Sequence, residues 1–343
     1  MKKILVIKFG TASITHATGE PDEAVIASIA RQVADLQGQY RVVLVSSGAV
    51  GAGKSLIHSY KGSLTERKAA AAIGNPLLLN LYAAAFRPYG IAIAQSLCER
   101  GHFANRRQFL QLQETYETLW DNGIVPIANE NDVVSNLELK FSDNDELAVL
   151  IAAGFGAESL LISTSSGGLQ DGEGRIIPQV TDVDADVLGL VRDDKSALGL
   201  GGMFSKLTYT RLATRMGIRT VFFNVRTPDG ILLALSGGTG TEFLPQAASL
   251  RSRQRWLGSG SLIAGRLTLD AGAVRALQNR KSLLAVGVRR VKGSFEKNDV
   301  IELADSHAQV VAVARSNYDA AFVEANLSTQ NLEIAHADNI VLI

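Results

Sequence analysis

The feature that most constrains the fold is an alternation of short apolar runs with longer helical stretches between residues 3 and 225. The runs are rich in Val, Ile and Leu, and the stretches 22–37 and 64–86 have the length and apolar content of helices. Parallel strands need such crossovers, and strands buried on both faces are continuously apolar. The pattern predicts an α/β protein, a three-layer α/β/α sandwich with a mainly parallel sheet. Its predicted strands are ILVIKF (4–9), RVVLVS (41–46), IAIAQ (91–95), IVPIA (124–128), SLLIS (159–163) and RTVFFN (219–224).

A change of pattern after residue 247 predicts a second domain. The segment GTEFLP is followed by the basic run ASLRSRQRW (248–256), which interrupts the alternation of strands and helices. Beyond it, short alternating strands surround one helical stretch near DAGAVRALQN (270–279), which predicts a small β-rich, PUA-like barrel. The expected limits are 1–247 for the first domain, 248–260 for a linker and 261–343 for the barrel.

Composition excludes several classes of protein. With 46% hydrophobic residues the 343-residue chain can bury a full core, and 34 Lys+Arg against 34 Asp+Glu leave no net charge to attract nucleic acid or anionic membranes. The single cysteine, Cys98, excludes a disulfide framework, and the five histidines never fall at metal-ligand spacing. Only four apolar residues precede Lys8, too few for a signal peptide, and no apolar run reaches membrane-span length. We expect a cytoplasmic protein with no metal cage of its own.

Polar or glycine-rich segments follow the predicted strands at four places. Ligands of open α/β sheets bind at the carboxyl ends of the strands, so these segments predict the site. They are KFGTAS with Lys8 at the strand end, SSGAVGAGKS, NENDVVSNLELKFSDNDELA (129–148), and LGLGGMFSKL with Lys206 in the first turn of a helix. A glycine loop at a helix N-terminus suits a phosphate chain, whereas the short acids and amides of 129–148 suit a small zwitterion.

Each of these segments also has a simpler explanation. A lone lysine such as Lys8 is commonly the solvated end of an edge strand. Asp143 and Glu146 have the spacing of a capping box, so helix capping alone explains them equally well. Gly201 and Gly202 need do no more than allow the chain to turn. Whether these segments form a ligand site or have only structural roles therefore has to be judged from all of them together.

The segment GAVGAGKS (48–55) matches the phosphate-binding pattern G-x-x-x-x-G-K-[ST] of P-loop NTPases and lies between a strand and a helix. Such an enzyme needs a later apolar strand ending in Asp to hold Mg²⁺, but the run SLLIS is followed by hydroxyl residues. The P-loop hypothesis also leaves 129–148 and the late glycine loop unexplained. We interpret the match as accidental.

Taken in order, the segments resemble the amino acid kinase family, in its branch with a C-terminal PUA domain, over nearly the whole chain. The resemblance rests on GTAS after Lys8, VSSGAVGAG, AAIGN (71–75), ANEND (128–132), SDND (142–145), GLGGMFSK (199–206), GTEFLP (240–245), and GRLTLDAGAVRAL with SLLAVGVRRVKGSFEKNDVI in the tail. Several motifs in a fixed order are far more specific than any one of them. The resemblance implies ATP-dependent phosphorylation of the γ-carboxylate of L-glutamate, the first step of proline biosynthesis.

The resemblance also implies residue roles. The substrate-binding set is Ser47, Asn129, Asp132 and Asn144. The ATP-binding set is Lys8, Thr164, Ser165, Leu200, Gly201, Gly202, Met203, Phe204, Ser205 and Lys206. The chain departs from the family's pattern with Ser165 in place of Asp, Asn75 in place of Gln, Gln113 in place of Arg, and Leu200 and Ser205 in place of Thr.

The expected chemistry needs no general base, because the side-chain carboxylate of glutamate has a pKa of about 4.3 and is already ionised at neutral pH. It needs cations instead, because an anion must approach a polyanion. We expect catalysis by Lys8 and Lys206, which contact the β- and γ-phosphate oxygens, and by Asp145, which orients both lysines. Mg²⁺ is expected to arrive with ATP and to keep several waters.

On the substrate side, Asp132 is expected to pair with the ammonium group of the amino acid. The amides of Asn129 and Asn144 are expected to hold its carboxylates. Glu130 is expected to be structural.

The expected partners are glutamate, further copies of the chain in a homo-oligomer, and a glutamyl phosphate reductase that consumes the product. RNA is not expected, because 261–343 carries nine Lys/Arg and nine Asp/Glu and so has no net charge. Three alternatives stay open at this point. They are a divergent paralogue acting on another amino acid, an RNA-binding or regulatory protein on an inactive kinase scaffold, and a P-loop NTPase.

Overall fold

The computed structural model describes residues 2–99, 102–103, 106–133, 144–191, 202–246, 265–279, 281–295, 297, 300–337 and 340–342. The chain separates into two compact units, of which unit 1 comprises Met1–His102 and Arg107–Arg253 and unit 2 comprises Phe103–Arg106 and Gln254–Ile343. Each unit has its own buried apolar cluster. The linker expected over 248–260 lies outside the described residues, so the domain limits stay predictions.

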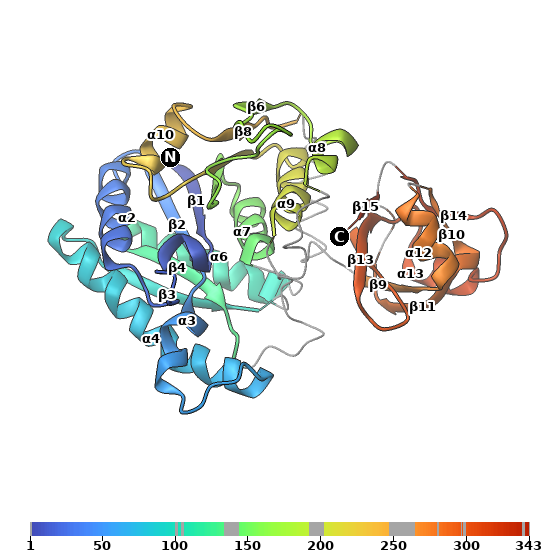
Figure 1. Ribbon diagram of the computed structural model, residues 1–343, viewed down its shortest axis with the longest axis horizontal. Coiled ribbons are helices and arrows are strands. Elements are labelled where there is room, and N and C mark those ends of the chain that lie inside the picture. The colour runs from blue at the N-terminus through green and yellow to red at the C-terminus, as the bar shows by residue number, and fades with distance from the viewer. Residues whose placement is uncertain are drawn as a thin grey trace. The chain divides into compact units, whose positions relative to one another are not determined.

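Unit 1 is built on one sheet, which has eight strands within the described residues, in the order β3-β4-β2-β1-β5-β7-β8-β6 (Figure 1). All neighbouring strands are parallel except β7 and β8. The register places Lys8 of β1 between Val45 of β2 and Ile162 of β5, so the carboxyl ends of these strands lie side by side. The strands are β1 Lys3–Phe9, β2 Tyr40–Ser46, β3 Ile93–Cys98, β4 Val125–Glu130, β5 Ser159–Ser163, β6 Gln179–Val180, β7 Arg219–Phe223 and β8 Thr241–Phe243.

Helices cover both faces of this sheet, which confirms the predicted three-layer sandwich (Figure 1). One face shares a buried apolar cluster with α2, α4 and α10, to which β1 contributes Leu5, Ile7 and Phe9. On the other face α7 and α9 pack against β1, β5 and β7. Because side chains alternate along a strand, Lys8 points to the face covered by α7. The helical segments of unit 1 are α1 Thr11–Ile14, α2 Glu23–Leu36, α3 Ala49–Gly53, η1 Lys54–Leu56, α4 Leu64–Phe86, η2 Arg87–Tyr89, α6 Arg106–Asp121, α7 Asn144–Phe155, α8 Ala185–Gly189, α9 Met203–Arg215 and α10 Gly230–Ser236.

The helix α4 anchors the segment that follows β2. It begins at a capping box in which Ser63 and Glu66 satisfy each other's backbone N–H groups. A Cβ atom on Gly74 would lie 1.7 Å from the carbonyl oxygen of Ala49, so only glycine allows α3 to approach α4 this closely. Further along α4, the hydroxyl of Tyr82 lies 3.0 Å from Ser46 Oγ. Burial raises the pKa of Tyr82 to about 12, so its hydroxyl stays protonated.

The same helix corrects the expectation that no apolar run is long enough to cross a membrane. Among the described residues, the segment Leu64–Tyr89 is long enough for a membrane span and contains an 18-residue window with a mean hydropathy of 1.4. Its side chains Leu78, Tyr82 and Phe86 are buried in the apolar cluster of unit 1. Such burial is typical of a core helix in a folded α/β domain.

Unit 2 contains, in the described part of the chain, a five-stranded sheet of order β11-β9-β12-β13-β15 and a two-stranded sheet of β10 and β14. The predicted helix near 270–279 is confirmed as α12, which Asp270 caps by accepting a 2.8 Å hydrogen bond from Ala273 N. A second helix, α13, was not predicted. The elements are β9 Gly265–Leu269, α12 Ala271–Gln278, β10 Leu283–Leu284, η3 Ala285–Gly287, β11 Val288–Gly293, β12 Val300–Ala304, β13 Val310–Arg315, α13 Ala320–Ala325, β14 Glu333–Ala335 and β15 Ile340–Leu342.

The six strands predicted for unit 1 are all present, and their ends differ from the prediction by at most three residues, the largest shift being at β3. The shift that matters for function is at β4. This strand continues through Asn129 and Glu130, which the sequence had placed in the loop, and both side chains are buried.

Candidate active site

A cavity of about 720 Å³ opens at the carboxyl ends of β1 and β5 and at the N-terminus of α9. This is the edge of the sheet that the sequence predicts for a ligand. The described residues that line it are Lys8, Gly10, Thr11, Ala12, Ser13, Ser47, Ser163, Thr164, Ser165, Ser166, Gly168, Leu169, Gln170, Asp171, Leu190, Val191, Gly202, Met203 and Lys206. Hydroxyl groups and two lysines dominate this wall.

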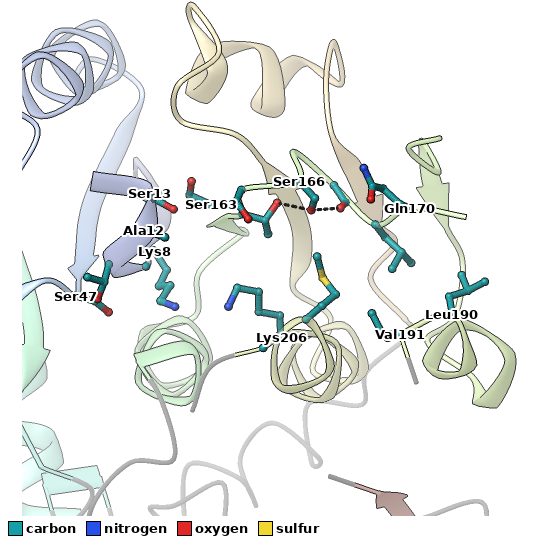
Figure 2. Close-up of a pocket in the computed structure, with 18 of the residues that line it drawn as sticks. Lys8, Ala12, Ser13, Ser47, Ser163, Ser166, Gln170, Leu190, Val191 and Lys206 are labelled. Atoms are coloured by element: carbon teal, nitrogen blue, oxygen red, sulfur yellow. Dashed lines mark hydrogen bonds between the residues drawn. The ribbon is translucent and has the colours of Figure 1, made fainter. Parts of the chain in front are cut away.

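Two lysines from distant segments meet at one buried carboxylate. Lys8 Nζ lies 2.5 Å from Asp145 Oδ1, and Lys206 Nζ lies 3.0 Å from Asp145 Oδ2. Figure 2 shows the two lysine side chains pointing toward one another from the ends of β1 and α9. Asp145 is fully buried in the first turn of α7, and both lysines are largely buried as well. The carboxylate therefore fixes two ammonium groups at the cavity wall.

A chain of side-chain hydrogen bonds runs beside this pair and joins α7, β4, α4 and the loop after β2. Asn144 Nδ2 donates to Ser47 Oγ at 2.8 Å and to Asn129 Oδ1 at 2.9 Å. Asn129 Nδ2 donates in turn to Asn75 Oδ1 of α4 at 3.0 Å. Three of the predicted substrate residues are thus brought together, and of these only Ser47 lines the cavity.

The fourth predicted substrate residue, Asp132, lies in the turn after β4 and is half-buried. It is not among the described residues that line the cavity. Its neighbours 134–143 lie outside the described residues, as does Asp143 of the possible capping box. The role of Asp132 therefore stays a prediction.

The predicted ATP-binding residues fall on two parts of the cavity. Thr164 and Ser165 line it directly after β5, and hydrogen bonds from Val225 N to Ser163 Oγ (3.3 Å) and from Thr164 N to Phe223 O (2.7 Å) tie this corner to the end of β7. At the other part, Gly202, Met203 and Lys206 line the cavity. Phe204 and Ser205 belong to α9, and Ser205 is not among the described lining residues. Leu200 and Gly201 lie outside the described residues.

The segment 48–55, which matches the P-loop pattern, has a structural role in this fold. Its glycines serve close packing, because a Cβ on Gly53 would lie 2.0 Å from Ala70 O of α4, and one on Gly51 would lie 2.6 Å from Gly19 O in the turn before α2. Lys54 belongs to the short helix η1 and is absent from the described cavity lining. Gly53 therefore lets α3 approach α4, and Gly51 lets it approach the turn at Gly19.

The segment KFGTAS, which the sequence analysis singled out, contributes Thr11, Ala12 and Ser13 of α1 to the wall, although no role was assigned to them. Sequence reasoning missed another part of the wall, which comprises Gln170, Asp171, Leu190 and Val191 and follows β5 at a distance along the chain. The sequence around Leu190 and Val191 carries no functional signal.

Comparison with known proteins bears directly on this arrangement. Residues 3–224 match the profile of the amino acid kinase family, and residues 265–331 match that of the PUA domain. The chain belongs to the amino acid kinase family. This confirms the resemblance inferred from the motifs. Because the amino acid kinase fold differs from the fold of P-loop NTPases, membership of this family excludes the P-loop hypothesis.

Relatives within the amino acid kinase family match over the full length. Glutamate 5-kinase of Dehalococcoides mccartyi is 36% identical over 99% of this chain and 98% of its own, and glutamate 5-kinase of Synechococcus elongatus is 36% identical over 100% of both chains. Among solved structures, carbamate kinase of Giardia lamblia bound to AMP-PNP aligns with a TM-score of 0.53 at 19% identity, covering 71% of this chain and 99% of that one. The structural match supports the fold alone.

Proposed function

We propose that the chain is an ATP-dependent carboxylate kinase that phosphorylates the γ-carboxylate of L-glutamate. The observation that carries this proposal is the pair of lysines, Lys8 and Lys206, held on opposite oxygens of the buried Asp145 at the cavity wall. The full-length relatives named glutamate 5-kinase support the choice of substrate. The first step of proline biosynthesis follows from that reaction.

The geometry suits transfer between two anions. The substrate carboxylate is ionised at neutral pH and attacks the γ-phosphorus directly, so no proton needs to be removed. The barrier comes from repulsion, since negative charge spreads over the phosphoryl oxygens in the transition state. Lys8 and Lys206 offset this charge, and Asp145 keeps the two ammonium groups in place before the substrates bind.

The nucleotide is expected along the hydroxyl-lined wall. Thr164, Ser165 and the start of α9 are the residues proposed to contact it, together with Leu200 and Gly201. Backbone N–H groups at the N-terminus of α9 suit phosphate oxygens. The carboxylate of Asp145 is already shared by two lysines, so we propose that Mg²⁺ enters as the ATP complex and keeps waters and phosphate oxygens as its main ligands.

Four further predictions go with this function. The chain acts as a homo-oligomer, works in the cytoplasm, supplies its acyl phosphate to a glutamyl phosphate reductase, and does not depend on RNA. Unit 2 is then a regulatory or oligomer-supporting domain.

The decisive experiment is a panel of amino acids incubated with ATP, Mg²⁺ and the full chain, in which hydroxylamine traps any acyl phosphate as a coloured hydroxamate. L-Glutamate should give the highest kcat/KM. A different preferred amino acid would support the divergent paralogue, and no turnover together with salt-dependent RNA binding would support the inactive scaffold.

A second test concerns the substrate side of the site. Asp132→Ala should raise the KM for the amino acid far more than the KM for ATP, because a carboxylate can pair with the substrate ammonium. An equal rise of both KM values would instead indicate general structural damage.

A further inference from the structure

A single arginine, Arg226, joins three segments of unit 1 that lie far apart in the chain. It lies in the turn between β7 and α10. Its Nη1 donates a 2.7 Å hydrogen bond to Asp22 Oδ2, and its Nη2 donates another of 2.7 Å to Thr15 O. These contacts span 204 and 211 positions of the chain. The planar guanidinium therefore fixes the distance between its two acceptors, which a single ammonium group does less well.

One of the three segments is the helix α1, which supplies the cavity wall next to Lys8. Its residues 11–13 line the cavity, and a Cβ on Gly10, directly before them, would lie 3.7 Å from Lys8 Nζ. Figure 2 shows Ala12 and Ser13 next to Lys8. Because Lys8 is proposed to contact the phosphates, this wall borders the phosphate chain of the nucleotide.

The helix α1 has few hydrogen bonds of its own to hold it in place. It is a single turn of four residues, and its N-cap residue Gly10 makes no side-chain capping hydrogen bond. A helix this short is not stable by itself, and the carbonyl groups of its last turn need partners from outside the helix. Asp22 N donates to Ile14 O at 2.8 Å, and Arg226 donates to Thr15 O. The position of α1 therefore depends on Asp22 and Arg226.

Asp22 connects the same contact to the start of α2. Its Oδ1 accepts a 3.2 Å hydrogen bond from Val25 N and so caps α2, while its Oδ2 accepts from Arg226. Asp22 is buried, whereas the side chain of Arg226 is 40% exposed. The helix α2 packs in the apolar cluster of unit 1, so it gives α1 a rigid support.

We propose that Arg226 is a positioning residue for nucleotide binding, because it holds Thr15 O and Asp22 together and so keeps the α1 wall beside Lys8 in place for the phosphates. Arg226 is not among the described residues that line the cavity, so it acts through α1. The inference rests on the proposed function, in which the phosphates of ATP lie at Lys8.

The test measures the dissociation constant of the non-hydrolysable ATP analogue AMP-PNP with Mg²⁺, by calorimetry on the full chain, together with the KM for glutamate and the melting temperature. Arg226→Ala should weaken AMP-PNP binding about tenfold, the size expected for one hydrogen bond to a charged group, and should leave the KM for glutamate unchanged. Arg226→Lys keeps a cation for Asp22 but loses the planar fork. It should fold like the wild type and bind AMP-PNP with an affinity between those of the wild type and Arg226→Ala.

Arg31→Ala is the matched control. Arg31 of α2 pairs with Asp229 of the same turn between β7 and α10, and its side chain is 43% exposed, much like that of Arg226. It therefore joins α2 to this turn without a contact to α1, and its loss should leave AMP-PNP binding unchanged.

Three results would overturn the inference. They are AMP-PNP binding equal to that of the wild type in a folded Arg226→Ala or Arg226→Lys, an equal weakening of AMP-PNP and glutamate in Arg226→Ala, and a weakening of AMP-PNP in Arg31→Ala as large as in Arg226→Ala. The last two would mean that unit 1 has loosened as a whole. Failure of the proposed function would look different, namely no hydroxamate from glutamate with the wild type, and the binding of AMP-PNP would still decide the role of Arg226.

Discussion

Replacing Lys206 by alanine tests the catalytic pair most directly. In this site one unit charge about 4 Å from another, at an effective dielectric constant of about 20, is worth about 4 kcal/mol. If Lys206 makes that interaction mainly with the charge that develops in the transition state, its loss should lower kcat by about 10³-fold. The fold should persist, because Asp145 keeps Lys8 at 2.5 Å and does not become an unpaired buried charge.

The assay is the initial rate of hydroxamate formation at saturating ATP and glutamate, together with the melting temperature of each variant. Lys3→Ala is the control, since Lys3 lies on the same strand as Lys8 but is exposed and pairs with Glu158 at 2.8 Å. Exposed pairs of this kind contribute about 0–1 kcal/mol, so this variant should behave like the wild type. A kcat within tenfold of the wild type for a well-folded Lys206→Ala would refute the argument.

Three further predictions address the fold and the rejected motif. Lys54→Ala should leave kcat unchanged, whereas a P-loop enzyme would lose its turnover. Gly74→Ala should lower the urea midpoint of unfolding, because its Cβ would lie 1.7 Å from Ala49 O, and such overpacking costs about 1–3 kcal/mol. Burial alone would raise the pKa of Asp22, but its hydrogen bond from Arg226 and other contacts lower it overall. Asp22→Asn should therefore destabilise the protein at pH 7, and the difference from the wild type should shrink as the pH falls below the unfolded value of 3.8 towards the lower folded pKa, as measured by urea unfolding at each pH.

The strands of unit 1 could be predicted because their information is local. A run such as SLLIS has enough apolar side chains to be buried on both faces, and it occurs in the structure with the predicted limits. The end of β4 could not be predicted, because Asn129 and Glu130 are polar and their place in the strand depends on pairing with Leu97 and Cys98 of β3. Without knowledge of that pairing, short polar residues at the end of an apolar run predict a loop.

The two lysines of the candidate site could be predicted from the sequence, whereas the contacts of its asparagine side chains could be predicted only in part. Lys8 and Lys206 each follow a recognisable element, a strand end and a glycine loop, so sequence reasoning could assign both to one ligand. The hydrogen bond between Asn75 and Asn129 could not be predicted, because it joins residues 54 positions apart in the chain. The hydrogen bond from Glu130 N to Asn129 Oδ1, which orients this amide, is likewise encoded by no sequence pattern.

The sequence by itself determined the layered architecture and the kinds of group available for chemistry, because strand and helix periodicity and strand-end residues are properties of short segments. The tertiary structure alone decided that Lys8 and Lys206 share Asp145, and that Asn144 donates hydrogen bonds to Ser47 and Asn129. The physical reason is that hydrogen bonds and ion pairs act over a few ångströms. Their partners are chosen by packing that brings together residues far apart in the chain.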